Sequence, residues 1–126
     1  MFSPRSAFSG FSVDDLAVAK EFYAATLGLT VDPDGVGARI RLPGGGSVFL
    51  YPKPDHQPAT FTVLNFEVED IDAAVEDLTS RGVALERYEN IPGIDAKGIM
   101  RGRERNTGPD IAWFLDPARN VLAVIH

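Results

Sequence analysis

The sequence contains no cysteine, only two histidines and no long apolar run. The missing thiols exclude disulfide bonds, thiolate catalysis and every zinc or iron–sulfur site that depends on cysteine. A helix needs about 20 apolar residues to cross a bilayer, so we expect no membrane span and no membrane partner. The first ten residues lack the charged start, apolar stretch and cleavage motif of a secretory signal. We therefore expect a cytoplasmic protein.

Basic charge is also scarce, because 12 Lys and Arg residues face 18 Asp and Glu residues, a net charge of −6. Non-specific binding to nucleic acid depends on cationic side chains that displace counterions, so we expect no nucleic-acid partner. The chain does have an ordinary share of apolar residues, 44% of its 126 residues. Such a composition is typical of a globular protein, and the length favours a single domain.

The last 17 residues, DIAWFLDPARNVLAVIH, show the clearest local pattern. Two apolar runs, Ile111–Leu115 and Val121–Ile125, are rich in the branched and aromatic residues that favour strands. Between them, Pro117 and its Asp and Asn neighbours are typical of a tight turn. The pattern predicts a β-hairpin, one strand of which carries the only tryptophan, Trp113.

The chain also contains a weak internal repeat, because residues 12–16 (SVDDL) match residues 67–71 (EVEDI). In each copy a strand precedes the motif, and an acidic residue caps the helix that comes next. A glycine, Gly28 or Gly82, then ends the helix. Each copy should continue into three strands, so the predicted repeat is β-α-β-β-β.

The expected boundaries follow from apolar periodicity and from turn residues. Repeat one covers about 5–52, a proline-rich linker about 53–60, and repeat two about 61–126. In repeat one we expect strands over 7–13, 29–31, 38–42 and 47–51, a helix over 16–27 after Asp14 or Asp15, and a turn at 32–35. In repeat two we expect strands over 62–68 and 83–88, a helix from Asp70 to Gly82, and the terminal hairpin.

A long segment, residues 90–109, interrupts repeat two and contains Lys97, Arg101, Arg103 and Arg105. Loops of this length inside a compact domain are usually functional or mobile. A short edge strand would place the three alternating arginines on one side. The segment is then either a lid that grips an anion over a pocket or a solvated edge strand protected from aggregation by its charge.

The two β-α-β-β-β copies, the helix signature with Phe22-Tyr23 and Leu27-Gly28-Leu29, and the aromatic-x-Asp-Pro hairpin together resemble one family. It is the vicinal oxygen chelate superfamily, which includes glyoxalase I, bleomycin-resistance proteins, extradiol dioxygenases and fosfomycin-modifying enzymes. The resemblance covers nearly the whole chain. It implies an α+β fold in which two βαβββ repeats form a curved mixed sheet around a central cavity, with the helices outside.

This resemblance also indicates where the sequence departs from the family. Metal-binding members place one ligand on each of four equivalent inner strands, and the corresponding residues here are Phe8, Phe49, Val63 and Ala123. Their side chains are hydrocarbons without the nitrogen or oxygen donors that a divalent metal needs. We therefore expect no metal and no cofactor. Arg119 replaces the usual glycine of the hairpin turn, at a cost of about 1 kcal/mol if its φ is positive.

Strand alternation assigns a mostly apolar and aromatic set of side chains to the cavity wall. These are Phe8, Gly10, Ser12, Ser47, Phe49, Tyr51, Val63, Asn65, Glu67, Ile111, Trp113, Val121, Ala123 and Ile125. Such a wall suits a small organic ligand held by stacking and a few hydrogen bonds, unless the side chains fill one another's space. The ligand-binding residues that we predict are Phe8, Phe49, Tyr51, Val63, Asn65, Glu67, Trp113, Ala123, Arg101 and Arg103.

Catalytic candidates are few. His56 lies in the proline-rich linker and His126 is the last residue, and no Ser/His/Asp spacing indicates a nucleophile. Glu67 is a weak candidate for a catalytic base, provided that it is buried among apolar groups. The leading hypothesis is thus a metal-free small-molecule binding protein that resembles the bleomycin-resistance branch and takes a cationic or planar ligand.

Two other hypotheses stay open. One is an enzyme, a lyase, isomerase or dioxygenase-like protein with a metal-independent or unconventional metal site. The other is a regulatory or scaffolding domain with a filled core. Because related proteins commonly complete their cavities across a two-fold axis, we also expect a homodimer.

Overall fold

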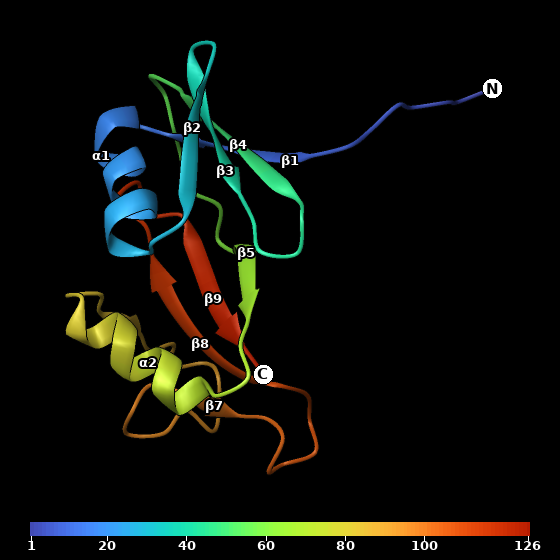
Figure 1. Ribbon diagram of the computed structural model, residues 1–126. Helices are drawn as coiled ribbons and strands as arrows, with labels where there is room; N and C mark the ends of the chain where they lie inside the picture. The colour runs from blue at the N-terminus through green and yellow to red at the C-terminus, as the bar shows by residue number, and fades with distance from the viewer. The chain divides into compact units, whose positions relative to one another are not determined.

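The computed structural model describes all 126 residues, which form two compact units, Met1–Pro58 and Ala59–His126. Each unit begins with a strand and a helix, and continues with further strands (Figure 1). The strands form two separate mixed sheets, one in each unit. The predicted α+β class is therefore confirmed.

The first unit is a four-stranded sheet with helix α1 packed against β3 and β4. In spatial order its strands are β1 (Ser9–Val13), β4 (Ser47–Pro52), β3 (Gly37–Arg41) and β2 (Thr30–Asp34). Strand β1 runs parallel to β4, and the other neighbours are antiparallel. Helix α1 (Leu16–Glu21) begins after Asp15, whose carboxylate accepts the Val18 amide at 3.2 Å. Of the two predicted caps, Asp15 therefore caps this helix.

The single helix expected over 16–27 divides into two parts. The α-helix ends at Glu21 and a π-helical turn, η1 (Phe22–Thr26), comes directly after it. Tyr23 in this turn is completely buried, and its ring centre lies 5.2 Å from that of Phe22. Gly28, at φ 73°, then ends the helical segment as predicted.

The predicted turn at 32–35 is wrong, because β2 continues through Pro33 to Asp34 and the chain turns at residues 35 and 36. Strand β2 lies at the edge of the sheet, where a missing backbone amide is tolerated. Ion pairs from Asp34 to Arg39 and from Asp32 to Arg41 hold this edge strand to β3. Cross-strand pairing therefore outweighs the turn preference of the local sequence.

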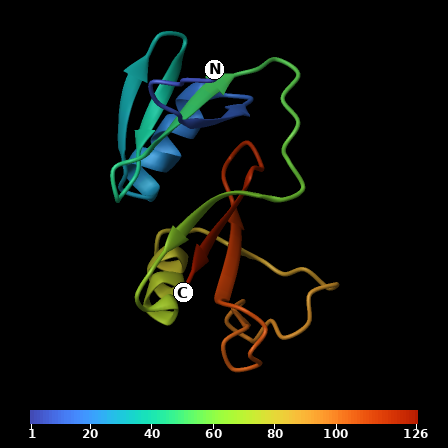
Figure 2. The ribbon, with the colours of Figure 1, turned by 90° about the vertical axis from the view of Figure 1, so that its right-hand side faces the viewer.

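The second unit places helix α2 (Ile71–Ser80) along one face of its sheet, against β8 and β9 (Figure 2). In spatial order its strands are β5 (Thr62–Glu67), β9 (Val121–Ile125), β8 (Asp110–Leu115) and β6 (Leu85–Glu86), while β7 (Met100–Arg101) also pairs with β8. Asp70 caps α2 by accepting the Ala73 amide at 3.0 Å. The predicted hairpin is confirmed as β8 and β9.

Two strands of the second unit are shorter than expected. The strand predicted over 83–88 is only Leu85–Glu86, and the short edge strand considered for the three arginines ends at Arg101. A Cβ atom at Gly102 would lie 2.3 Å from the Pro109 carbonyl oxygen, so the chain folds tightly back on itself here. Residues 102–108 therefore form turns, which lead into β8.

The hairpin turn has the predicted chemistry. The Asp116 carboxylate accepts the backbone amide of Asn120 at 2.8 Å and its side-chain amide at 3.0 Å. Arg119 has φ 70°, so it adopts the left-handed conformation that glycine usually supplies. Both Asp116 and Asn120 are buried, and their mutual bonds satisfy polar groups that would otherwise be costly to bury.

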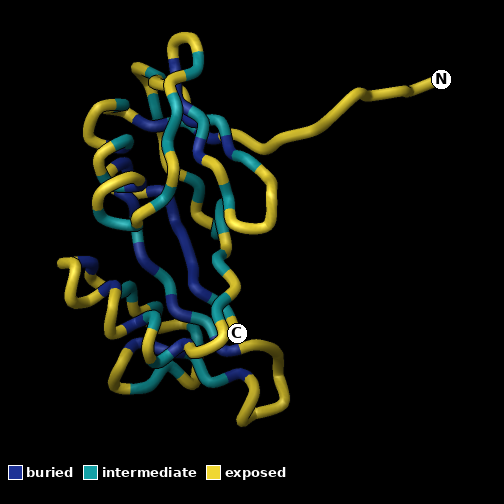
Figure 3. Tube along the Cα trace, viewed as in Figure 1, coloured by how far each residue is buried: buried dark blue, intermediate teal, exposed yellow.

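In most strands the buried residues alternate with more exposed ones, whereas β9 is buried from Val121 through Val124 and therefore on both faces (Figure 3). In the first unit the side chains on the face beneath the helix are Phe11, Val13, Ala38, Ile40, Val48 and Leu50. In the second they are Ala112, Phe114, Leu122 and Val124. The longest helix, α2, has ten residues, and no helix has the length and apolar character needed to cross a membrane.

Candidate functional site

An aromatic cluster surrounds Arg39 on the face of the first sheet that α1 leaves uncovered. The guanidinium carbon of Arg39 lies 4.5 Å from the centre of the Phe8 ring and 5.7 Å from that of Phe49. The Phe49 ring in turn stacks on Tyr51 at 6.0 Å, with 19° between the ring planes. Phe8 and Tyr51 are exposed, by 60% and 36%. This face therefore offers aromatic surface beside a cation.

Two features hold this cluster in place. Arg39 donates from Nε to the Asp34 carboxylate at 2.8 Å and from Nη1 to the Ser47 hydroxyl at 3.1 Å. Gly37 leaves room for the Phe49 ring, because a Cβ atom there would lie 2.9 Å from that ring and 2.1 Å from the Leu50 carbonyl oxygen. A cation held over aromatic rings in this way is attracted by about 0.5–1 kcal/mol at exposed sites.

Sequence reasoning missed Arg39 as a member of this face. The alternation that assigns Phe49 to the helix-free side applies to β3 as well. There Ile40 points to the buried face, so its neighbour Arg39 points to the helix-free face, and the strand pattern alone could have placed it there. A charged side chain beside aromatic ones was not recognised as part of a binding surface.

The first sheet also carries a hydroxyl–imidazole pair. Ser12 lies beside Tyr51 in the register of β1 and β4, and its Oγ is 2.6 Å from Nδ1 of His56. The two residues are separated by 44 positions in the sequence, which explains why spacing alone did not reveal the pair. Such a pair can share or transfer a proton, depending on the tautomer of the ring.

In the second unit, Trp113 lies on the helix-free face of β8, between the buried Ala112 and Phe114. Its indole Nε1 donates to the Thr62 hydroxyl at 3.1 Å. The Tyr88 ring meets the indole edge-on, with ring centres 5.6 Å apart. Burial, and then the nearby charge of Glu86, raises the pKa of Tyr88, so its hydroxyl stays protonated in neutral solution.

An open hollow of about 190 Å³ lies beside Trp113, and Thr62, Tyr88 and Val121 line it together with residues 60–61 and 90–91. Its walls combine aromatic rings with hydroxyl and amide groups. Such a lining suits one flat ring with a polar substituent.

The other predicted residues of the second sheet have different surroundings. Asn65 pairs with the fully buried Ala123 in the register of β5 and β9, and Val63 lies at an irregularity of that register. Glu67 is exposed at the end of β5, so it lacks the apolar burial that its role as a base required. That condition for catalysis by Glu67 is not met.

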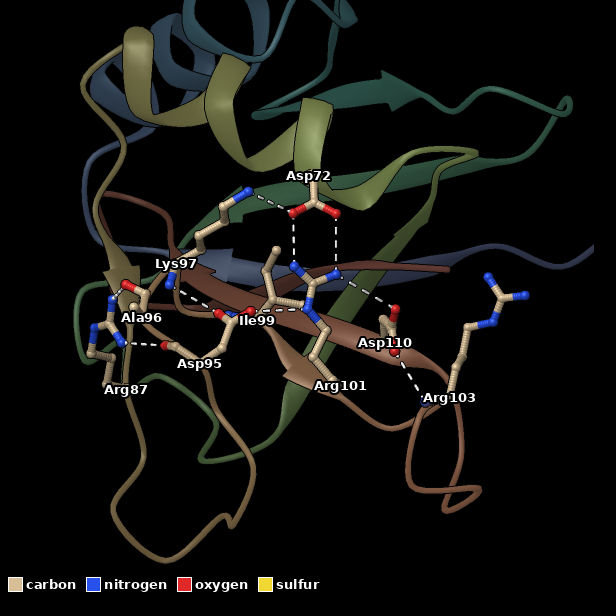
Figure 4. Close-up of polar contacts among 9 residues, drawn as sticks. All are labelled: Asp72, Arg87, Asp95, Ala96, Lys97, Ile99, Arg101, Arg103 and Asp110. Carbon is tan, nitrogen blue, oxygen red and sulfur yellow. Dashed lines mark hydrogen bonds and ion pairs between the residues drawn. The ribbon is translucent and has the colours of Figure 1, made fainter.

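Arg101 lies in a cluster of ion pairs within the second unit (Figure 4). Its Nη2 and Nη1 donate to the two carboxylate oxygens of Asp72 at 2.7 and 3.1 Å, and its Nε donates to Asp95 at 2.9 Å. Nη1 also lies 3.9 Å from the Asp110 carboxylate. The protein's own carboxylates thus occupy this guanidinium, and we leave Arg101 out of the proposed ligand contacts. The exposed Arg103 side chain points away from the cluster (Figure 4) and does not line the hollow beside Trp113, so we leave Arg103 out of the proposed ligand contacts as well.

The cluster also shifts the pKa values of its carboxylates. Hydrogen bonds from Arg101 and then Lys97 hold the pKa of Asp72 well below its usual range. For Asp95, burial opposes ionisation, but hydrogen bonds from the Ile99 amide, Arg101 and the Lys97 amide outweigh it and lower the pKa. Both carboxylates are therefore charged in neutral solution.

The model of the Glyoxalase/Bleomycin resistance protein/Dioxygenase superfamily matches residues 8–124 of the chain. The chain belongs to this superfamily. The resemblance inferred from its repeats and its hairpin is thereby confirmed. No curated protein matches the sequence.

Solved structures with the same fold include other members of the superfamily. TnmS3, an antibiotic binding protein from Streptomyces sp. CB03234, is 27% identical, with 98% of each chain covered and a TM-score of 0.66. A glyoxalase/bleomycin resistance protein from the same organism is 26% identical, with 95% of this chain and 100% of that chain covered and a TM-score of 0.61. The fosfomycin resistance protein FosX from Listeria monocytogenes shares 13% identity and a TM-score of 0.66, with 99% of this chain and 93% of that chain covered, and so shows the fold alone.

The metal site of the superfamily does not fit the residues of this chain. At the four positions where the resemblance places the metal ligands, the chain has Phe8, Phe49, Val63 and Ala123, and none of these side chains carries a nitrogen or oxygen donor. Elsewhere, no three His, Asp or Glu side chains come together in a group that could hold a metal ion. We therefore assign no step to a metal.

Proposed function

We propose that this member of the superfamily binds a small organic molecule, without a metal ion, mainly through aromatic side chains. The observation that carries the proposal is the cluster of Phe8, Arg39, Phe49 and Tyr51 on the helix-free face of the first sheet. Aromatic side chains that are exposed together, beside a fixed cation, are typical of a binding surface rather than of a solvated sheet.

Two further observations support the proposal. The second unit has its own hollow beside Trp113, with an aromatic wall and polar groups at its edge. TnmS3, 27% identical along nearly the whole chain, is an antibiotic binding protein. We therefore propose a planar aromatic ligand, with an antibiotic as the first class to test.

The proposal of metal-free binding depends on the donor atoms. With hydrocarbon side chains at the four family positions, a metal would need unconventional ligands. Elemental analysis of protein purified without chelators tests this point. We expect less than stoichiometric zinc, nickel, manganese and iron, and one equivalent of any of them would contradict the proposal.

The binding test begins with a thermal-shift screen of antibiotics and metabolites, in which bleomycin and the planar cation proflavine are included as defined probes. We expect at least one compound to stabilise the protein and to bind saturably by calorimetry. Phe8→Ala should then weaken that binding by about 1–3 kcal/mol, as expected for an aromatic contact at the centre of an interface.

Phe2→Ala is the matched control, because Phe2 is 90% exposed and lies outside the cluster. It should leave the affinity unchanged. Equal effects of the two substitutions, or a screen without any stabilising compound, would count against the aromatic cluster as a binding site.

We also propose that the protein is a homodimer, as related chains of this superfamily commonly are. Sedimentation equilibrium at micromolar concentration should give twice the mass of the 13.6 kDa chain. A single species at the chain mass would contradict this proposal.

A further inference from the structure

The hollow beside Trp113 has one wall that is built from almost no regular structure. Tyr88, Asn90 and Ile91 line this side of the hollow, yet β6 ends at Glu86 and β7 begins only at Met100. The ladder of the sheet therefore does not hold these residues in place. A different set of interactions must keep the Tyr88 ring edge-on against the indole.

The first of these interactions starts next to Tyr88. The Arg87 guanidinium donates to the carbonyl oxygen of Asp95 at 2.8 Å and to that of Ala96 at 2.6 Å (Figure 4). These bonds tie the start of the 87–101 segment to its far side. They close the segment into a loop. The position of Arg87, and therefore of Tyr88, then depends on the positions of residues 95 and 96.

The Asp95 carboxylate holds that far side. It accepts hydrogen bonds from the amides of Lys97 at 2.9 Å and Ile99 at 3.0 Å, and from Nε of Arg101 at 2.9 Å. The Arg101 amide also donates to the Gly93 carbonyl oxygen at 3.3 Å. Both halves of the loop thus converge on Arg101.

Arg101 anchors the loop to the rest of the unit. Its two-pronged bond with Asp72 reaches the first turn of α2, where Lys97 Nζ also meets the Asp72 carboxylate at 3.0 Å. Paired N–H groups on a carboxylate fix orientation as well as distance. Hydrogen bonds from charged side chains therefore link α2 through Arg101 and Asp95 to Arg87, which directly precedes Tyr88 in the chain.

We propose that Arg101 is a positioning residue of the binding site, which holds the Tyr88–Ile91 wall of the Trp113 hollow in its open, ligand-accepting conformation. The expected effect on ligand affinity rests on the proposed function. The positioning of the wall can be measured without a ligand. The part of the basic segment up to Arg101 is then clamped rather than a mobile lid, and its first residues, Asn90 and Ile91, form part of the wall.

The test compares three substitutions in one segment. Arg101→Gln removes the anchor, Arg87→Gln removes only the two bonds beside Tyr88, and Arg103→Gln is the control, because the Arg103 side chain points away from the cluster (Figure 4). Three measurements are made on each protein: acrylamide quenching of the single tryptophan, hydrogen exchange of the amides over 88–94, and affinity for proflavine.

We expect Arg101→Gln and Arg87→Gln to raise the exchange rates over 88–94 by about tenfold, since each loses bonds that involve a charged donor. Acrylamide should quench Trp113 more strongly in both, and proflavine should bind about tenfold more weakly. Arg101→Lys should recover part of each change by restoring one charged contact. Arg103→Gln should behave as the wild type.

Arg87→Gln keeps the test decisive if Arg101→Gln does not fold, because Arg87 is exposed and its substitution leaves the anchor to α2 intact. Wild-type quenching and exchange in Arg87→Gln would overturn the positioning role. Unchanged proflavine affinity in a variant whose wall has loosened would overturn the link to binding. Loosening in the variants together with no binding of any screened compound, proflavine included, by the wild type would uphold the positioning and count against the proposed function.

Discussion

The two units start from the same plan of strand, capped helix and further strands, but their chains diverge after the helix. In the first unit the chain returns through tight turns into three well-formed strands, and the helix-free face carries the Arg39 aromatic cluster. In the second, charged hydrogen bonds hold a long segment around Arg101, and a hollow opens beside Trp113. The shared motif therefore builds the frame, and the chain after the helix contributes most residues of each candidate binding surface.

Large-to-small substitutions in the core should destabilise both units to a similar extent. Leu50 and Phe114 are almost completely buried beneath α1 and α2. Replacing either by alanine leaves a cavity, so we expect each substitution to lower the free energy of unfolding by about 2–5 kcal/mol. Urea denaturation monitored by circular dichroism measures this loss. If one of the two substitutions leaves the free energy of unfolding unchanged and the other lowers it, the two cores do not contribute equally to stability.

The two units should respond differently to acid, because low pH should loosen the 87–101 segment of the second unit. The lowered pKa values of Asp72 and Asp95 mean that these carboxylates stabilise the folded state above their unfolded pKa of about 3.9. That contribution is lost as the pH falls through the folded-state pKa, so the loss begins below about pH 4. Hydrogen exchange over 88–94 should therefore increase, relative to that of β3, between pH 5 and pH 3 once the intrinsic rates are corrected for pH.

Asp72→Asn provides the control for this acid effect. Without the Asp72 charge, the segment should already be loose at pH 7 and should respond less to acid. If acid loosens the wild type and this variant to the same extent, the ion pair with Arg101 is not the cause.

The smallest expected effect concerns the hairpin turn of the second unit. Arg119 adopts φ 70°, whereas the first unit places Gly44 and Gly45, at φ 92° and 105°, in the corresponding turn between β3 and β4. Arg119→Gly should relieve the strain and raise the free energy of unfolding by about 1 kcal/mol. Thermal denaturation would contradict this interpretation if the variant melts below the wild type.

Most of the frame could be predicted because its signals are local. Asp15 and Asp70 cap the helices, Gly28 and Gly82 adopt a positive φ just past the helix ends, and the terminal hairpin forms as its composition indicates. Each of these features depends on residues a few positions apart. Local preference failed at Pro33, because the position of β2 at the sheet edge was not visible in the sequence.

The candidate site was less predictable because its key contacts join distant residues. Arg101 meets Asp72 across 29 positions, and Ser12 meets His56 across 44. No periodicity encodes such pairs, so the alternation of Arg101, Arg103 and Arg105 does not indicate that only Arg101 joins the ion-pair cluster. Alternation did place Trp113 and Phe49 on the helix-free faces, and their role as ligand contacts stays a prediction.

Trp113→Ala tests most directly whether these aromatic side chains form a binding wall rather than core filling. For a wall residue that is half-buried, we predict that the affinity for a ligand from the screen falls by about 1–3 kcal/mol, while the denaturation midpoint changes little. The wild-type emission of this single tryptophan should be that of a partly solvated indole. A strongly blue-shifted emission, together with a loss of about 3–5 kcal/mol in unfolding free energy and unchanged affinity, would mean that Trp113 fills a packed interior, and it would contradict the claim that Trp113 forms a binding wall.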